Sequence, residues 1–333
     1  ALFISPHAIE MVYIPKGAFY AGSPDPVAQK NNAPFFTYSS GSPYKIESEE
    51  AIQVGTVQES LFYNNQNDTL YKGDAKGPIP SGFPKGFNAF YIMKYELSEG
   101  NYTAFLNSIS EYFTANRAGF MGRSYGNERG SITLKNGMYE TTNPNRPATF
   151  LSFDDDCAFA DWAGLRPMTE LEYEKASRGT VKPLFNDYPW GTQTRDKVSW
   201  YYDDSGNYVL QHPYSEKDLT DSNLEIFGAS YYWVMALNKS LWERCVTVGN
   251  EKGRLFTGSH GDGVLGGYFG NATNKDWPNS YDGKGGISYR GGGTYEFGMV
   301  GSPEGQIADR SFGAWGDGPR TIAYGFRAVR SAE

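Results

Sequence analysis

Two helical patterns lie close together between residues 146 and 191. In the first pattern, Ser152 precedes a run of apolar positions whose first turn also carries Asp154, Asp155 and Asp156. The Ser152 hydroxyl is a natural acceptor for the unpaired N–H groups of a first turn, and acidic side chains are favourable at the positive end of the helix dipole. Gly164 suits the left-handed backbone that often follows a helix. The pattern predicts a helix of about three turns between Ser152 and Gly164.

The second pattern begins two residues after Arg166-Pro167. Thr169 and Glu172 have the spacing of a capping box, in which the hydroxyl bonds forward to the backbone and the carboxylate bonds back. We therefore expect a second helix from Thr169 to Gly179, joined to the first helix by a tight connector.

Alternating apolar residues predict strands in two other places. The segment 9–23 alternates around Pro15-Lys16-Gly17, which predicts a hairpin. Residues 90–97 also alternate and lead into Ser98, a second N-cap candidate. Helical spacing of apolar residues follows Ser98, at Tyr102, Phe105, Leu106 and Ile109, and predicts a helix with that face in the core.

Two long polar stretches interrupt these elements, at about 24–86 and 115–145. The first is rich in Asn, Ser, Gly and Pro, and the second contains Asn136-Gly137, a strong hairpin signal. We interpret the chain as a single domain over 1–333 with two insertions. An insertion that cannot bury itself on its own domain is suited to packing on another chain, although the same feature also fits simple surface elaboration.

Composition limits the classes of function. The 333 residues, 39% of them hydrophobic, are enough to bury a substantial core, and the 40 glycines and 25 tyrosines indicate many ordered loops. A formal net charge of −8 argues against nucleic acid or an anionic membrane as the main partner. No apolar run approaches the ~20 residues of a membrane-spanning helix. Because the sequence starts at Ala1 without an initiator Met, we expect a processed chain that is secreted or on the cell surface.

Cysteine and histidine offer little metal chemistry. Cys157 and Cys245 are the two cysteines, and neither lies in a metal-spaced or redox motif. Two structural thiols are the favoured interpretation, and one disulfide between them is the alternative. The three histidines, His7, His212 and His260, are far apart in the sequence, which argues against a three-histidine iron site.

The helical region resembles the sulfatase-modifying factor family, whose best-known member is the formylglycine-generating enzyme. The residues that carry the resemblance are Pro147, Ser152, Phe153, Asp155, Trp162, Ala163, Gly164, Arg166, Pro167, Thr169, Glu170, Glu172, Glu174, Ala176, Arg178 and Gly179, followed by Pro189-Trp190-Gly191. The resemblance implies an α+β fold of the formylglycine-generating-enzyme-like, C-type-lectin-like kind. Such a fold has short helices, twisted antiparallel sheets and many ordered loops.

The end of the chain also resembles the family, except at the residues that carry its chemistry. The matching residues are Arg290, Gly291, Gly292, Arg310, Arg320, Gly325, Phe326 and Arg327. In the formylglycine-generating enzyme, two cysteines shortly after this Arg-Gly-Gly bind copper and abstract hydrogen from the substrate cysteine. The corresponding places fall near Glu296 and Gly301, and no cysteine follows Cys245. The resemblance therefore implies that copper and the oxidase activity are absent.

The resemblance also implies a calcium site. The family has a site that ends in a glutamate, which corresponds to Glu243 after Trp242, but Lys239 and Ser240 replace the preceding Gly and Asn. A second calcium site would use Asp203 or Asp204. The alternative is a Trp242-Glu243 turn without metal, and no cofactor is required by either interpretation.

We interpret the chain as a catalytically silent member that acts as a binding or assembly module. A protein, a glycan or further copies of the chain are the candidate partners, and the candidate binding residues are Tyr295, Glu296, Arg310 and Trp315. The first alternative is an enzyme of different chemistry in the same cleft, with candidate groups Glu296, Glu304, Asp309, Arg310 and Asp317. The second alternative is an accessory factor for a sulfatase-like client.

Overall fold

Two small sheets form the centre of the computed structural model. The structure describes residues 8–25, 32–66, 68–118, 130–202, 208–210, 215–238, 240–278, 285–293, 305–316 and 320–332. The first sheet is antiparallel, in the order β1 (Met11–Ile14), β6 (Phe90–Met93), β17 (Ala328–Ser331) and β9 (Arg166–Pro167). In the second sheet, β12 (Trp242–Val246) pairs antiparallel with β15 (Ile287–Arg290) and parallel with β16 (Tyr324–Gly325).

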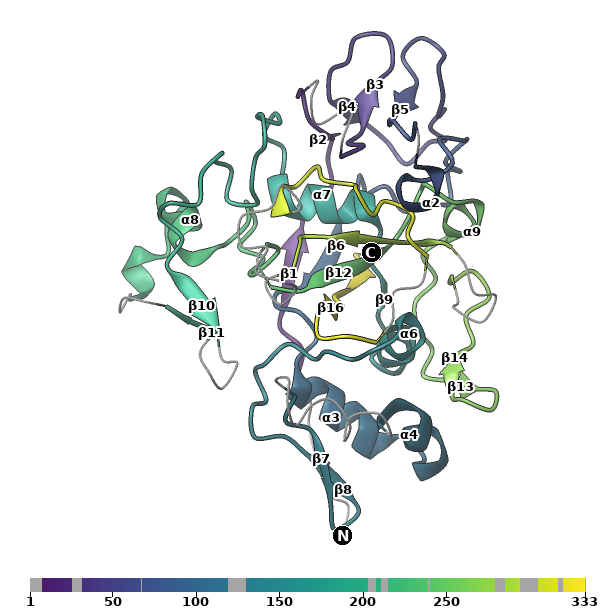
Figure 1. Ribbon diagram of the computed structural model, residues 1–333, viewed down its shortest axis with the longest axis vertical. Helices are drawn as coiled ribbons and strands as arrows, with labels where there is room; N and C mark the ends of the chain where they lie inside the picture. The colour runs from purple at the N-terminus through teal and green to yellow at the C-terminus, as the bar shows by residue number, and fades with distance from the viewer. Residues whose placement is uncertain are drawn as a thin grey trace.

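The two predicted helices are confirmed as α6 (Phe153–Trp162) and α7 (Glu170–Arg178). Both begin with a complete capping box, which Ser152 forms with Asp155 and Thr169 forms with Glu172. Gly164 has a φ of 65°, as expected after a helix. In Figure 1, α7 lies on one side of the central strands and α6 on the other. Local capping signals therefore placed both helices correctly.

The insertion at 24–86 forms an arm at one end of the molecule (Figure 1). Its elements are β3 (Phe36–Thr37), β4 (Tyr44–Ile46), β5 (Leu61–Phe62) and α2 (Thr69–Lys72). The arm does not stand apart from the domain, because Phe35, Leu61, Tyr63 and Phe83 are fully buried members of the main hydrophobic core. This insertion therefore packs on its own chain.

The predicted hairpin at 9–23 is wrong. Its two strands, β1 and β2 (Phe19–Ala21), do not pair with each other: β1 pairs with β6, and β2 pairs with β4 of the arm. Alternation identified both strands correctly, but pairing is decided by which distant strand buries the apolar face.

The opposite end of the molecule contains α3 (Glu99–Ser108), α4 (Glu111–Ala118) and the hairpin of β7 (Thr133–Lys135) with β8 (Met138–Glu140). The Ser98 hydroxyl accepts from the Asn101 N–H, as predicted, and α3 buries Tyr102, Phe105 and Leu106. The Asn136-Gly137 turn is confirmed, with φ values of 53° and 81°. The strand predicted over 90–97 is shorter, since β6 ends at Met93.

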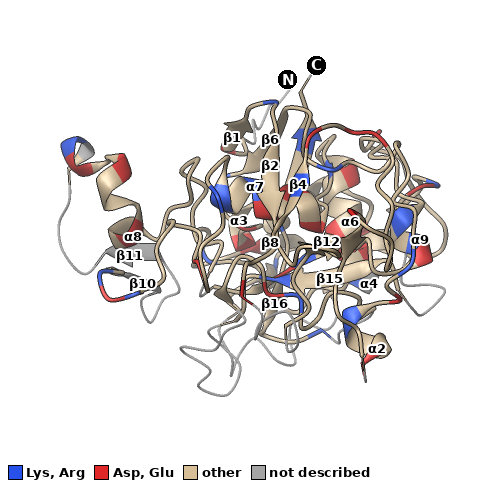
Figure 2. Ribbon diagram, turned by 90° about the horizontal axis from the view of Figure 1, so that it is seen from above, with Lys and Arg blue, Asp and Glu red and all other residues tan. Residues whose placement is uncertain are grey.

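The remaining elements lie at the periphery. They are β10 (Trp200–Tyr202), β11 (Tyr208–Leu210), α8 (Leu224–Phe227), α9 (Glu251–Arg254), β13 (Leu265–Gly266), β14 (Asn271–Ala272) and the short 3-10 turns Glu216–Asp218 and Asp221–Asn223. Short helices, small sheets that are mostly antiparallel and long ordered loops make this an α+β fold, as expected. Among the described helices, none combines the length and the apolar character needed to cross a membrane. Basic and acidic segments are both dispersed over the ribbon in Figure 2.

Candidate functional site

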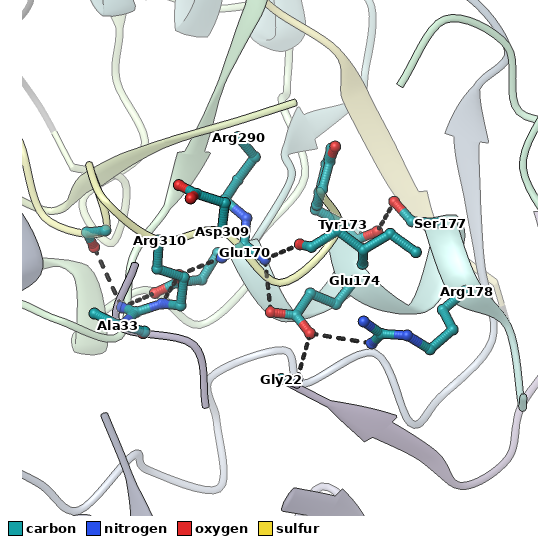
Figure 3. Close-up of polar contacts among 12 residues, drawn as sticks. Gly22, Ala33, Glu170, Tyr173, Glu174, Ser177, Arg178, Arg290, Asp309 and Arg310 are labelled. Atoms are coloured by element: carbon teal, nitrogen blue, oxygen red, sulfur yellow. Dashed lines mark hydrogen bonds and ion pairs between the residues drawn. The ribbon is translucent and has the colours of Figure 1, made fainter. Parts of the chain in front are cut away.

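Two glutamates of α7 face two arginines from the C-terminal part of the chain (Figure 3). The Glu170 carboxylate accepts from Arg310 Nε at 2.6 Å and from Arg290 Nη1 at 3.2 Å. Glu174 Oε1 accepts from Arg290 Nη2 at 2.6 Å. All four side chains are completely buried. The motif residues that are far apart in the sequence therefore meet in one ion-pair network beneath the surface.

The same network ties the arm and the following loop to α7. Glu174 Oε2 accepts from the Gly22 N–H at 2.6 Å, next to β2. At the end of α7, Arg178 donates to both oxygens of Asp187, at 2.8 and 3.0 Å. Helix α7 is therefore bonded to the segment after β2, to the loop that carries Asp187 and to the C-terminal arginines. These contacts give α7 a structural role.

In this network, partners of opposite charge offset the cost of removing charged groups from water. Burial raises the pKa of a carboxyl group, but the charge and hydrogen bonds of Arg310, followed by Arg290, outweigh that effect and lower the pKa of Glu170. Burial would lower the pKa of Arg290, and Glu174 and Glu170 raise it instead. Glu170 and Arg290 are therefore stabilised in their ionised forms.

Arg310 is the first of the predicted binding residues, and it lies inside this network. Its guanidinium lies 4.2 and 4.3 Å from the ring centroids of Phe35 and Tyr63, two rings that meet edge to face, and it donates to the Ala33 carbonyl. With no exposed surface, Arg310 positions the arm rather than presenting a charge to a ligand. The residues around Arg310 in the sequence did not show whether it binds a ligand or positions the arm.

Trp315, the second described candidate, is half-buried at the edge of an aromatic cluster. Its ring contacts four others, which belong to Tyr71, Tyr289, Phe312 and Tyr324, at centroid distances of 5.3 to 5.8 Å. The indole therefore contributes to packing and still exposes part of its surface.

The candidates Tyr295, Glu296, Glu304, Asp317 and Asp204 lie outside the described residues, so their roles stay predictions. Asp309 is buried and accepts from the N–H and the hydroxyl of Ser311.

Glu243, the expected calcium ligand, has a different partner. Arg327 donates to both of its carboxylate oxygens, at 2.9 and 2.8 Å, and both side chains are buried. A guanidinium that occupies both oxygens and carries a positive charge does not fit a calcium ion at Glu243. Within the described residues, no group of three or more His, Cys, Asp or Glu side chains is arranged to hold a metal.

Glu96 is a buried carboxyl group that the sequence reading missed as a candidate. Its oxygens accept from the Ser240 hydroxyl and from the Leu241 N–H. Burial, and then the nearby Glu243 carboxylate, raise the pKa of Glu96 to about 8, although Arg327 opposes the shift. The only sequence signal was a lone glutamate at the end of the alternating 90–97 segment.

The two cysteines are free, buried thiols in separate hydrophobic clusters. Cys157 lies on α6, and Cys245 lies on β12. Burial raises the pKa of both thiols well above the ordinary cysteine value. The interpretation as structural thiols is therefore confirmed, and the alternative disulfide is wrong.

Comparison with known proteins agrees with this architecture. The profile of the sulfatase-modifying factor enzyme 1-like domain matches residues 5–332. The chain is 43% identical over 53 residues to the formylglycine-generating enzyme of Thermomonospora curvata. This aligned stretch covers 16% of this chain and 17% of that enzyme. It is 22% identical over 169 residues to the enzyme of the same name from Bos taurus, covering 44% of each. The matched stretches thus span less than half of these relatives.

Solved structures with a similar arrangement are more distant in sequence. PvdO from Pseudomonas aeruginosa is 17% identical, with a TM-score of 0.43 over 98% of this chain and 95% of that chain. The Treponema denticola variable protein 1 is 16% identical, with a TM-score of 0.39 over 90% of this chain and 99% of that chain. On the match of its sequence to the family profile over almost its whole length, this chain belongs to the sulfatase-modifying factor enzyme 1-like domain family.

Proposed function

We propose that this chain is a member of its family without copper-dependent oxidase chemistry, and that it acts outside the cytoplasm as a binding or assembly module. The observation that carries the proposal is the placement of its thiols. Two thiolates that converge on one Cu(I) ion are what the family's oxidation requires. Cys157 and Cys245 lie in different hydrophobic clusters, and both thiols are held protonated by burial. The residues present therefore do not fit a copper site.

The alternative of a different chemistry in the same cleft has weaker support. Arg310 and Asp309, the described members of its candidate set, are buried and bonded to neighbouring protein groups. Proton transfer to a substrate requires a group within hydrogen-bond reach of that substrate. Neither side chain offers such a group at the surface.

Exposed aromatic surface supports a binding role. Tyr112 of α4 and the loop residues Tyr268 and Phe269 are 52%, 67% and 41% exposed. Their rings contact one another, with centroids 5.4 Å apart for Tyr112 and Tyr268 and 5.0 Å apart for Tyr268 and Phe269. Grouped exposed tyrosines suit contacts with proteins or glycans, because a rigid ring provides area at a low entropic cost.

The oxidase part of the proposal is tested by incubating the protein with copper, a reductant and a Cys-x-Pro-x-Arg peptide. We expect no loss of peptide thiol and no aldehyde by mass spectrometry. A thiol reagent should leave Cys157 and Cys245 unlabelled in the native protein and label both after unfolding. Formation of formylglycine would refute the proposal, and rapid native labelling would remove the observation on which it rests.

The binding and assembly part is tested separately by the mass of the native particle in light scattering after size exclusion. A mass that is a multiple of 37.0 kDa supports assembly, and a monomer supports binding to a ligand. Retention of the protein in the cytoplasm of its source cell, found by fractionation, would contradict the expected location.

A further inference from the structure

A polar cleft of about 430 Å³ lies where β6 leads into α3. The chain between these elements supplies Tyr95 and Ser98, and the first turn of α3 supplies Asn101. Asn145 contributes from the segment that follows the β7–β8 hairpin, and Ile9 comes from the chain before β1. This volume falls within the ~300–1,000 Å³ range of small-molecule sites.

Backbone hydrogen bonds hold the walls of this cleft. The Glu99 N–H donates to the Arg146 carbonyl at 2.7 Å, and the Gly100 N–H donates to the Pro144 carbonyl at 2.9 Å, so the start of α3 is fixed to the segment that carries Asn145. On the other side, the Lys94 N–H donates to the Glu10 carbonyl at 2.9 Å. A cleft built on such paired segments is formed before any ligand arrives.

Two amide side chains in the cleft have no partner. Within the described residues, the side-chain amides of Asn101 and Asn145 make no hydrogen bond, although most other polar groups nearby do. Each amide offers a donor and an acceptor side by side. The Ser98 hydroxyl already accepts from the Asn101 N–H and keeps its own O–H to donate.

Among the described residues around it, the cleft presents no net charge. At its rim, Lys94 Nζ lies 2.6 Å from the Glu10 carboxylate, so these charges compensate each other. Glu96, which also lines the cleft, is engaged by Ser240 and Leu241, and burial keeps it largely protonated at neutral pH. An ion would meet no uncompensated partner here, whereas a neutral molecule with several hydroxyl groups would.

Tyr95 adds a surface for stacking. Its side chain is 40% exposed, and the Lys94 ammonium lies 5.6 Å from the ring centroid. An aromatic face beside paired amide donors and acceptors matches a pyranose, whose ring C–H groups pack on aromatic surface while its hydroxyls both donate and accept.

We propose that the cleft between β6 and α3 binds a neutral carbohydrate of one or two sugar units, which Tyr95 stacks against and which Asn101 and Asn145 hydrogen-bond. This inference rests on the proposed binding role and assigns it a place and a ligand class. No residue with metal-ligand geometry takes part, so binding is independent of calcium.

The test is saturation-transfer NMR of the full chain with glucose, galactose, N-acetylglucosamine, cellobiose, maltose, lactose and chitobiose, followed by titration of the best ligand. The protein should be produced without N-glycosylation, because Asn101 starts an Asn-Tyr-Thr sequence. We expect transfer to at least one sugar, unchanged by EDTA or by added salt. A neutral acetylated trialanine peptide, tested in parallel, should not bind.

Variants locate the site. Tyr95→Ala and Asn145→Ala, both at exposed positions, should each raise the Kd of the bound sugar about tenfold, and Tyr95→Phe should keep most of the affinity. The matched controls Tyr38→Ala and Asn88→Ala, also exposed, should change nothing. Absence of transfer to every sugar, preference for the peptide, or equal affinity of the cleft variants and the controls would each overturn the proposal. The peptide oxidation assay does not depend on sugar binding. A negative result for the cleft would therefore leave the proposed absence of oxidase activity untouched.

Discussion

The buried network on α7 makes a quantitative prediction for Glu170→Gln. The Glu170 carboxylate accepts from Arg310, Arg290, the Thr247 hydroxyl and the Val248 N–H. A glutamine of the same size removes the negative charge and turns an N–H₂ group toward groups that are all donors. Two guanidinium groups would then be buried with too little compensating charge.

Removing one partner of a buried ion pair costs ~3–5 kcal/mol, whereas the whole free energy of unfolding of a typical protein is ~5–15 kcal/mol. We therefore expect Glu170→Gln to lose about a fifth of the stability or more. Because the unfolding entropy grows with chain length, at ~2.1 cal/mol/K per residue, the Tm of this chain of 333 residues should fall by ~4–7 °C. Urea and thermal unfolding followed by circular dichroism measure both quantities.

An exposed ion pair in the arm at 24–86 provides the control. Glu47 pairs with Lys45, and the side chain of Glu47 is 65% exposed. Glu47→Gln should leave the stability almost unchanged, because solvent screens such a pair. If the free energy of unfolding of Glu170→Gln lies within ~1 kcal/mol of that of the unsubstituted protein, the structural role assigned to the α7 network is wrong.

Two further predictions concern Glu96 and Trp315. The pKa of Glu96 is raised to about 8 in the folded state, against ~4.3 when unfolded, so its contribution to stability is full at low pH and is lost as pH rises through that interval. Glu96→Gln cannot ionise, so its free energy of unfolding should fall less between pH 5 and pH 8 than that of the parent; parallel pH profiles in urea titrations would contradict this. Trp315→Ala should lower the free energy of unfolding by about 2 kcal/mol or more, since a partly exposed indole that contacts four neighbouring rings is removed, whereas Trp315→Phe should cost less. A Trp315→Ala variant with unchanged thermal stability would show that the indole is a surface ring available only for binding.

Local signals in the sequence determined the elements whose stabilising contacts are also local. The caps of α6 and α7 depend on side chains three residues apart, and the turn at Asn136-Gly137 depends on its own two φ angles. These elements were predicted in the right places. The family resemblance further implied the α+β fold, because its motif residues cover both helices and the last strands.

Tertiary structure alone decided the pairing of strands and the role of each charged residue. The strands of the 9–23 segment join β6 and β4, since the free energy of pairing depends on burial against distant parts of the chain. Arg310, in a loop, and Glu243, in β12, are charged residues, yet both lie in the core because a buried partner of opposite charge compensates the cost of desolvation. A sequence shows that a charge is present, but the partner that makes its burial possible comes from a segment many residues away.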